Sequence, residues 1–248
     1  MFVSERRGRV LELLPNGSRR VAHEFVVDAT GEAGLLGLAV SASFPADGWL
    51  YAYFTSLVDN RVVRFRPGGT VEPILTGIPK AAFHDGGIIA FAPDGTLFVG
   101  TGDASVGNRA QDLGSLGGKI LRLHPDGAIP ADNPFPGSPV WSYGHRNVQG
   151  LAWNAAGQMY ANDLGPDADD EINLIRPGGN YGWPVVTGEA GRNEFIDPIF
   201  VRQPEEASWS QLALLQGSSL PQWEGDLFAA ALRGQRLWRV RVGADARV

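Results

Sequence analysis

The stretch "IIAFAPDGTLFVGTGD", residues 88–103, sets out a plan: an apolar strand-like run, a turn at Asp94 and Gly95, a second apolar run and a polar exit at Asp103. The stretch "GLAWNAAGQMYANDLG" (150–165) repeats this plan, and "LAVSASFPADGWLYAYFT" (38–55) is a longer version of it. The copies are about 45 to 65 residues apart, a period typical of a β-propeller in which each repeat is one four-stranded blade. An irregular β-sandwich is the alternative architecture.

The remaining sequence also reads as all-β. Glycine (33 residues) and proline (17 residues) occur throughout, and helical segments with capping residues are nearly absent. Strand-like runs occupy residues 34–40, 48–55, 60–66, 86–93, 95–103, 118–125, 157–165, 171–179, 225–234 and 235–242. We therefore predict that residues 1–248 form a single β-propeller domain of four-stranded antiparallel blades.

Composition restricts the class of protein. Hydrophobic residues make up 44% and charged residues 19%, which is typical of a globular domain. A net charge of −6 argues against nucleic acid as the main partner. The absence of cysteine excludes disulfides, thiolate nucleophiles and cysteine zinc sites.

No targeting or membrane segment is expected. No apolar run approaches the ~20 residues of a membrane span. The N-terminus "MFVSERRGRV" carries charges where a signal peptide has its apolar stretch, so this chain has no recognisable export signal. A trimmed form of an exported protein would look the same, so the cellular location is left open.

Polar residues at the ends of inner strands are the candidates for chemistry, because propellers place their ligands on the central channel. His84 and Asp85 precede one such strand, and a histidine can act as a general base because its unperturbed pKa is about 6.5. Asp103 ends the next strand and can orient or charge-pair a neighbour. A structural histidine in a turn and an aspartate capping the loop backbone are the alternatives.

A second polar cluster lies in "VWSYGHRNVQGLAW", residues 140–153, between two strand-like flanks. Arg146, flanked by His145 and Asn147, offers five fixed donors to a carboxylate, a quinone oxygen or an oxyanion. Each unpaired buried group would cost roughly 1–3 kcal/mol, so the cluster is either internally paired or binds a ligand. The alternative for Arg146 is a structural salt bridge to Asp103 or Asp85.

The loop "NDLGPDADDEINLIRPGGNYGWP", residues 162–184, is rich in hard oxygen ligands. Asp167, Asp169, Asp170 and Glu171 supply carboxylates, and the glycine- and proline-rich backbone supplies free carbonyls, a combination that suits Ca²⁺. The spacing is not that of an EF-hand. A solvated acidic loop is the alternative.

Five motifs in this order resemble those of the soluble quinoprotein glucose/sorbosone dehydrogenases, the PQQ-dependent aldose sugar dehydrogenases. They are "GEAGLLGLAV", "HDGGIIAFAPDGTLFVGTGD", "AQDLGSLGGKILRLHPDG", "WSYGHRNVQGLAW" and "GPDADDEINLIRPGGNYGWP", and the resemblance runs from about residue 3 to residue 242. It implies a six-bladed propeller that holds pyrroloquinoline quinone (PQQ) and Ca²⁺ on its axis. The implied reaction is oxidation of aldose sugars to lactones by hydride transfer to the quinone.

The resemblance also implies roles for single residues. His84 corresponds to the base that removes the proton of the anomeric hydroxyl group, and Asp103 to the carboxylate beside it. Arg146 and Asn147 correspond to the donors on the reactive carbonyl edge of the quinone.

Further positions correspond to the cofactor rim and to calcium ligands. Glu32 and Gln111 fall on the rim, and Arg233 falls where a basic residue meets a cofactor carboxylate. The calcium positions are the main-chain oxygens of Gly165 and Pro166, with Asp170, Glu171 and Tyr181 where the family can hold further calcium.

Two departures from the family pattern lie at the chain ends. The resemblance places an inner strand before "FVSERRGRV" and a last blade, with an arginine pair for the cofactor carboxylates, after "WRVRVGADARV". This leaves four complete blades and a three-strand remnant, "MFVSERR", "GRVLELL" and "RRVAHEF". We expect such a chain to close as a five-bladed ring or, preferably, to form a homodimer through its open edges.

The departures keep two other functions open. One is a calcium-dependent hydrolase of lactones or phosphotriesters, using calcium, His84 and Arg146 without PQQ. The other is a non-catalytic propeller that serves as a binding surface.

Overall fold

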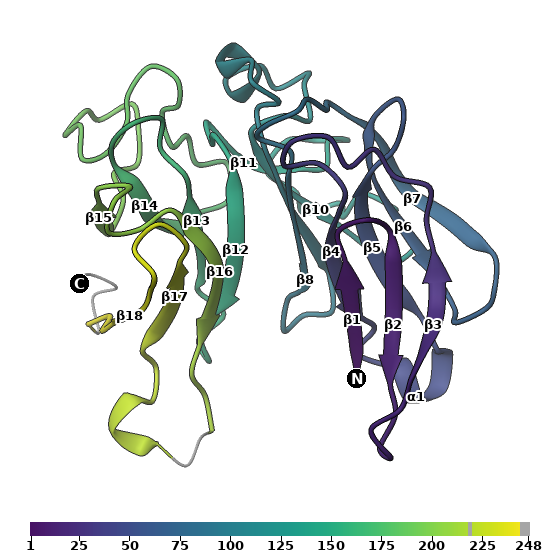
Figure 1. Ribbon diagram of the computed structural model, residues 1–248. Coiled ribbons are helices and arrows are strands. Elements are labelled where there is room, and N and C mark those ends of the chain that lie inside the picture. Colours follow the sequence, from purple (N-terminus) through teal and green to yellow (C-terminus); the bar gives the residue numbers. More distant parts are fainter. Residues whose placement is uncertain (218–219, 244–248) are drawn as a thin grey trace.

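The computed structural model describes residues 1–217 and 220–243 and is almost entirely β-structure (Figure 1). Eighteen strands form five antiparallel sheets, and within each sheet neighbouring strands are consecutive along the chain. The helical elements among the described residues are single turns: α1 (Phe44–Asp47), η1 (Gly107–Ala110) and η2 (Pro221–Trp223). The predicted all-β propeller architecture is confirmed.

The sheets follow one another in chain order. The first holds β1 (Phe2–Glu5), β2 (Arg9–Leu13) and β3 (Arg19–Glu24). The second holds β4 (Leu35–Val40), β5 (Leu50–Thr55), β6 (Asn60–Phe65) and β7 (Val71–Ile78). The third holds β8 (Gly86–Phe91), β9 (Leu97–Thr101), β10 (Lys119–Leu123) and β11 (Val140–Tyr143). The fourth holds β12 (Val148–Trp153), β13 (Met159–Asp163), β14 (Asp170–Ile175) and β15 (Phe200–Arg202), and the fifth β16 (Trp209–Leu214), β17 (Leu227–Ala231) and β18 (Arg236–Val240).

Each of the ten predicted runs contains a strand, and the three N-terminal runs form the first sheet. The strands β7 (Val71–Ile78), β15 (Phe200–Arg202) and β16 (Trp209–Leu214) were not predicted from the sequence. β7 contains Pro73 and Gly77 and is half-exposed, β15 is only three residues long, and β16 presents polar residues to the axis. The fifth sheet has three strands within the described range rather than the four of a complete blade.

Apolar cores lie between neighbouring sheets. Phe25, Phe54 and Phe65 pack the first sheet onto the second. Tyr53, Ile89 and Leu121 fill the next interface, followed by a core around Phe98 and Val148 and another around Trp209. Each blade is therefore stabilised mainly by its neighbours, as in other repeat architectures.

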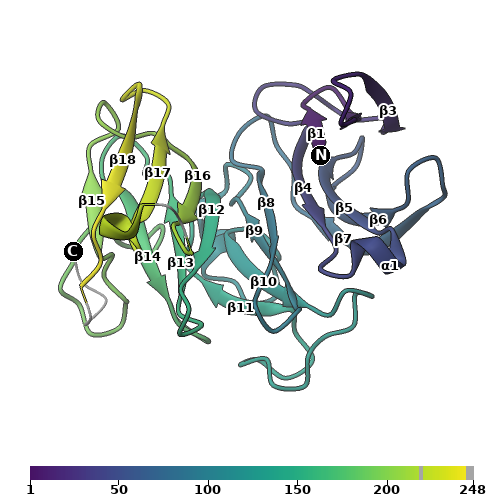
Figure 2. The same cartoon turned by 90° about the horizontal axis from the view of Figure 1, so that it is seen from below.

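The inner strands β4, β8, β12 and β16 lie next to one another around the axis (Figure 2). The first and last sheets lie at the two ends of this row, and no strand pairing or hydrogen bond joins β1–β3 to β16–β18 in the described residues. The resemblance places a further blade after "WRVRVGADARV". The end of this stretch, residues 244–248, lies outside the described residues. Among the described helices, none has the length and apolar character needed to cross a membrane.

Candidate active site

His84 and Asp103 form a hydrogen-bonded pair at one end of the third sheet. His84 precedes β8 and Asp103 follows β9, and the pairing of Gly86 with Thr101 brings these strand ends together. The Nδ1 atom of His84 lies 2.9 Å from Oδ1 of Asp103, with the histidine side chain 20% exposed and the aspartate side chain 2% exposed. Within the described chain, no protein group hydrogen-bonds Nε2 of His84, so this nitrogen is available to a substrate.

The carboxylate of Asp103 is held by several donors. Oδ1 also accepts a hydrogen bond from the backbone of Ser105 at 2.8 Å, and Oδ2 accepts one from Nε1 of Trp183 at 2.8 Å. Burial alone would raise the pKa of Asp103, but the hydrogen bonds from His84, Trp183 and Ser105 outweigh it and lower the pKa. An ionised Asp103 favours a proton on Nδ1 of His84, which leaves Nε2 as the acceptor.

The backbone around this pair is strained. His84 has φ 62°, Ala104 has φ 49° and Ser105 has φ 60°, values that residues other than glycine rarely adopt. Two contacts hold His84: its backbone N–H donates to Oε2 of Glu32 at 3.0 Å, and its carbonyl accepts from Ala104 at 3.0 Å. A Cβ at Gly102 would lie only 1.8 Å from the carbonyl oxygen of His84, so this approach requires glycine. Such strain is typical of functional sites.

Arg146 and Asn147 enter the same region from the start of the fourth sheet. The backbone N–H of Arg146 donates to Oδ2 of Asp163 at 3.0 Å, and the backbone N–H of Asn147 donates to Oδ1 of Asp163 at 2.6 Å. The backbone N–H of Asp103 donates to the carbonyl of Arg146 at 2.8 Å, which joins this loop to the His84–Asp103 pair. The two clusters found in the sequence therefore form one site.

The side chains of Arg146 and Asn147 keep donors free. Nη1 of Arg146 donates to the carbonyl of Leu164 at 3.1 Å, whereas its buried Nε has no partner. The alternative role, a salt bridge to Asp103 or Asp85, is not observed: in the described part of the chain Arg146 pairs with no carboxylate. Oδ1 of Asn147 accepts from the backbone of Gly86 at 2.9 Å and from Gln149 at 3.1 Å, while the described residues offer no acceptor to its Nδ2 group.

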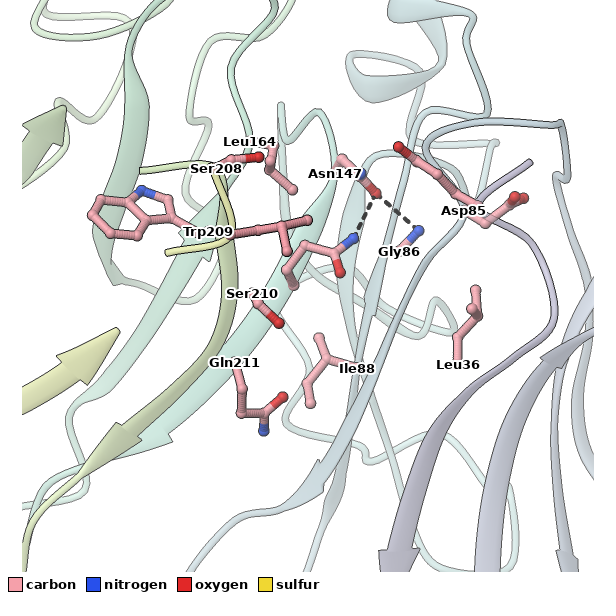
Figure 3. A pocket seen from close by; sticks show the side chains of 13 residues that line it. Leu36, Asp85, Gly86, Ile88, Asn147, Leu164, Ser208, Trp209, Ser210 and Gln211 are labelled. Carbon is pink, nitrogen blue, oxygen red and sulfur yellow. Dashed lines mark hydrogen bonds between the residues drawn. The ribbon is translucent and has the colours of Figure 1, made fainter. Parts of the chain in front are cut away.

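A cavity of about 310 Å³ lies on the axis beside these groups (Figure 3). All four inner strands shift register near their beginnings, and such bulges redirect side chains. The cavity wall is apolar on the β4 and β8 side, at Leu36 and Ile88, and polar on the β12 and β16 side, at Gln149, Ser210 and Gln211. Glu32 and Asp85 line it as well, and no lysine or arginine does so among the described residues.

Asp170 and Glu171 do not point at a common ion. They are neighbours in β14 and face opposite sides of the sheet. The carboxylate of Asp170 accepts hydrogen bonds from the backbones of Gly165 at 2.8 Å and Ser208 at 2.6 Å. Oε1 of Glu171 accepts from the backbone of Gly188 at 2.8 Å, and its burial, with repulsion from Asp163, raises its pKa to about 8.

The other expected calcium ligands also have protein partners or lie apart. The hydroxyl of Tyr181 donates to the carbonyl of Leu174 at 2.7 Å. No group of three or more acidic or histidine side chains that could hold a metal occurs in residues 1–217 and 220–243. A small cavity of about 10 Å³, enough for one water-sized species, does lie between Arg146, Gly165, Glu171 and Tyr181.

Comparison with known proteins gives the family of this chain. The family model for glucose/sorbosone dehydrogenase matches residues 1–248. The chain belongs to the glucose/sorbosone dehydrogenase family. Members of this family are sugar dehydrogenases, and hence oxidoreductases, as are the similar structures that share 26% identity or more with this chain.

Similar proteins include the PQQ-bound aldose sugar dehydrogenase of Streptomyces coelicolor, with 43% identity and a TM-score of 0.92 over 99% of this chain and 75% of that chain. Aldose sugar dehydrogenase YliI of Escherichia coli is 30% identical over 88% of this chain and 67% of its own length. Quinoprotein glucose dehydrogenase B of Acinetobacter calcoaceticus is 34% identical over 76% of this chain but only 48% of its own length.

In this member of the glucose/sorbosone dehydrogenase family, two residues expected at the cofactor rim have other contacts. Gln111 donates from Nε2 to the carbonyl of Trp183 at 2.7 Å and to Oδ1 of Asn180 at 2.9 Å, so it fixes a loop. Arg233 pairs with Glu205 at 2.9 Å and its side chain is 57% exposed, away from the cavity.

The contacts of two residues of this candidate site were not predicted. Trp183 contacts the carboxylate of Asp103, and Asp163 binds the backbones of Arg146 and Asn147. Both occur inside quoted motifs, "NYGWP" and "NDLG", but a tryptophan and an aspartate near glycine carry no local signal of partners 80 or 17 residues away.

Proposed function

We propose that this chain oxidises aldose sugars to lactones, with PQQ as the hydride acceptor and Ca²⁺ as the accompanying cation. The free Nε2 of His84, backed by Asp103 and next to the unused donors of Arg146 and Asn147, carries this proposal. The PQQ-bound form of the similar Streptomyces coelicolor enzyme supports it.

The residues present fit such a cofactor at its quinone end. Arg146 keeps a buried Nε without a partner, and Asn147 presents an amide nitrogen at the cavity wall. Both are donors, and quinone oxygens are acceptors. The lining also holds the carboxylates of Glu32 and Asp85, so the carboxylates of PQQ would need compensating positive charge.

Calcium bound at the main-chain oxygens of Gly165 and Pro166 would supply such charge. The small cavity between Gly165, Glu171 and Arg146 has room for a single ion. Asp170, Glu171 and Tyr181 are the proposed ligands of further calcium. Because Asp170 and Glu171 face opposite sides of β14, they would serve different ions, and a cation beside Glu171 would favour its ionised form.

His84 performs the proton chemistry in this proposal. When bound, PQQ supplies an ortho-quinone that takes up a hydride. Nε2 of His84 accepts the proton of the anomeric hydroxyl as the C1–O bond of the sugar becomes the carbonyl of the lactone. Asp103, lying 2.9 Å from Nδ1, stabilises the resulting imidazolium. Arg146 and Asn147 orient the acceptor through donated hydrogen bonds.

The test is reconstitution with PQQ and Ca²⁺ followed by a dye-linked assay with aldoses. We expect cofactor-dependent dye reduction and a lactone product. Hydrolysis of lactones or phosphotriesters without PQQ would instead support the hydrolase, and saturable PQQ binding without turnover would contradict the dehydrogenase.

Calcium is testable separately from turnover. A ligand that binds only the native state stabilises it by RT ln(1 + [L]/Kd), about 2.7 kcal/mol at a hundredfold excess over Kd. We therefore expect Ca²⁺ to raise the melting temperature and EDTA to reverse the rise. An unchanged melting temperature at millimolar Ca²⁺ would remove calcium from the proposal.

We also propose that two chains associate through the strand edges at the ends of the row of sheets. Among the described residues, β1 pairs only with β2 and β18 only with β17, and exposed strand edges favour pairing with another chain. Sedimentation equilibrium should give the mass of a dimer, and a monomer at all concentrations would contradict this expectation.

A further inference from the structure

We propose that Trp183 is a positioning residue that fixes the His84–Asp103 pair and places Arg146 beside it. The effect of Trp183 on catalysis rests on the proposed function, whereas the contacts of Trp183 are observed independently of it.

The indole of Trp183 binds the carboxylate oxygen of Asp103 that does not contact His84. Nε1 donates to Oδ2 of Asp103 at 2.8 Å, while Oδ1 faces Nδ1 of His84 at 2.9 Å. With each oxygen bound, rotation of the carboxylate would break a hydrogen bond. Because the Asp103 side chain is only 2% exposed, water cannot readily replace a lost donor.

The same ring lies against the second part of the site. The guanidinium carbon of Arg146 is 5.4 Å from the centre of the Trp183 ring, within the range of a cation–π contact. Trp183 therefore touches both the proton acceptor pair and the arginine, which come from the third and fourth sheets. In the described chain, no other residue contacts the side chains of both Asp103 and Arg146 through a hydrogen bond, ion pair or ring contact.

The backbone of Trp183 is itself fixed. Its N–H donates to the carbonyl of Gly144 at 3.0 Å, and its carbonyl accepts from Nε2 of Gln111 at 2.7 Å. The following residue, Pro184, packs so closely on Gly107 that a Cβ there would lie 2.9 Å from the proline ring. These contacts give the indole N–H a defined direction, as a positioning role requires.

The N–H of Trp183 also affects the charge that His84 experiences. A donor on Oδ2 disperses the negative charge of Asp103, so its removal strengthens the attraction between the carboxylate and a protonated imidazole. The other charged groups near His84 are Glu32, Asp85, Arg109 and Arg146, and they are retained when only the indole is changed. Loss of the N–H is therefore expected to raise the pKa of His84.

The experiment compares Trp183→Phe with Trp141→Phe. Phenylalanine keeps an aromatic ring but removes the N–H together with the five-membered part of the indole, and Trp141→Phe makes the same change in size elsewhere. Trp141 serves as the matched control because its ring packs on Phe98 and Arg122, away from the dyad. The His84 imidazole is titrated by NMR in cofactor-free protein, with its signal assigned from a His84→Ala sample.

In Trp183→Phe we expect the midpoint of the His84 NMR titration to move to higher pH, and in Trp141→Phe to stay at the wild-type value. In the reconstituted enzyme, we expect kcat to fall roughly tenfold in Trp183→Phe with KM changed less than about twofold, since the proton acceptor is positioned less well while the groups that bind the sugar are unchanged. An unchanged His84 titration in folded Trp183→Phe would overturn the inference.

The two proposals fail in different ways. If the wild-type protein shows no sugar oxidation, the proposed function fails while the titration still tests Trp183. If Trp183→Phe does not fold, Gln111→Leu replaces it, because losing the bond to the Trp183 carbonyl should loosen the indole and raise the same pKa by a smaller amount. A His84 titration in that variant identical to wild type would then count against the inference.

Discussion

The candidate site contains two neighbouring histidine–aspartate pairs, and they differ in access to solvent. In the first, the side chains of His84 and Asp103 are 20% and 2% exposed, and Nε2 of His84 has no protein partner in the described chain. In the second, His145 and Asp163 are 0% and 7% exposed, and Nδ1 of His145 lies 3.3 Å from Oδ2 of Asp163. The same two residue types thus form one pair that can meet a substrate and one that cannot.

The second pair shapes the site instead. Nε2 of His145 contacts Oγ of Ser142 at 2.9 Å, and the imidazole stacks on the ring of Tyr181 at 4.7 Å. In space, Ser142, His145 and Asp163 therefore follow one another as the residues of a hydrolase triad do. Ser142 is fully buried, however, and cannot reach a substrate. The carboxylate oxygens of Asp163 accept hydrogen bonds from the backbone N–H groups of Arg146 and Asn147. Accessibility, rather than residue type, separates a proton acceptor from a structural support.

The largest expected effect comes from removing the accessible histidine. His84→Ala should lower kcat roughly 10²–10⁴-fold, the range for loss of a general base, because no other described group replaces its free nitrogen. The melting temperature should change little, since a partly exposed side chain is lost. Steady-state assays and thermal melts of the reconstituted enzyme measure both.

His145→Ala is the matched variant and should behave in the opposite way. It leaves a cavity beneath Tyr181 and should lower the free energy of unfolding by about 2–4 kcal/mol. Near-normal turnover in His84→Ala would break the comparison, because the accessible pair would then be structural as well.

The next effect concerns the carboxylate that supports the loop. Asp163→Asn replaces one acceptor oxygen by an amide donor facing the backbone N–H of Arg146 or Asn147. We expect a loss of about 2–3 kcal/mol in stability, as for a charge-assisted hydrogen bond, together with weaker cofactor binding. Denaturant melts and a PQQ titration would measure this. A variant with wild-type stability and affinity would show that the loop is held in place by other contacts.

The smallest effect is a pH dependence of stability at Glu171, which lies next to Asp163. Burial and that neighbour raise its pKa to about 8. Between the ordinary value near 4.5 and about 8, the native state keeps a proton that the unfolded chain releases. The contribution of protonated Glu171 to the free energy of unfolding is therefore fully present below this pH window, and it decreases as the pH rises through the window.

In EDTA, the wild-type protein should lose on the order of 2 kcal/mol between pH 6 and pH 8 relative to Glu171→Gln, which cannot ionise. Glu189→Gln, at an exposed position in the same region, is the control and should follow the wild-type curve. Parallel curves for wild type and Glu171→Gln would show that Glu171 is ionised throughout this range.

Much of the fold was readable from local patterns. An apolar run, an Asp-Gly or Asn-Ala-Ala-Gly turn and a second run predict a hairpin, because these preferences act within a few residues, and β8–β9 and β12–β13 form as expected. The candidate residues His84, Asp103, Arg146 and Asn147 were found because propellers present the ends of inner strands to the axis, and the structure brings all four together. Arg233 instead pairs with Glu205 in the structure, since its position in the sequence does not fix where its side chain points.

The partners of these residues depended on the packing of blades. Trp183 reaches Asp103 across 80 residues, and Gln111 reaches Trp183 across 72. Such contacts follow from the angle between neighbouring sheets, which is set by cores such as Phe98 on Val148 and not by any short segment. Composition and periodicity thus determine that this chain forms blades with polar residues at the axis. Burial, which arises only when the blades pack, determines that His84 remains open to a substrate and His145 does not.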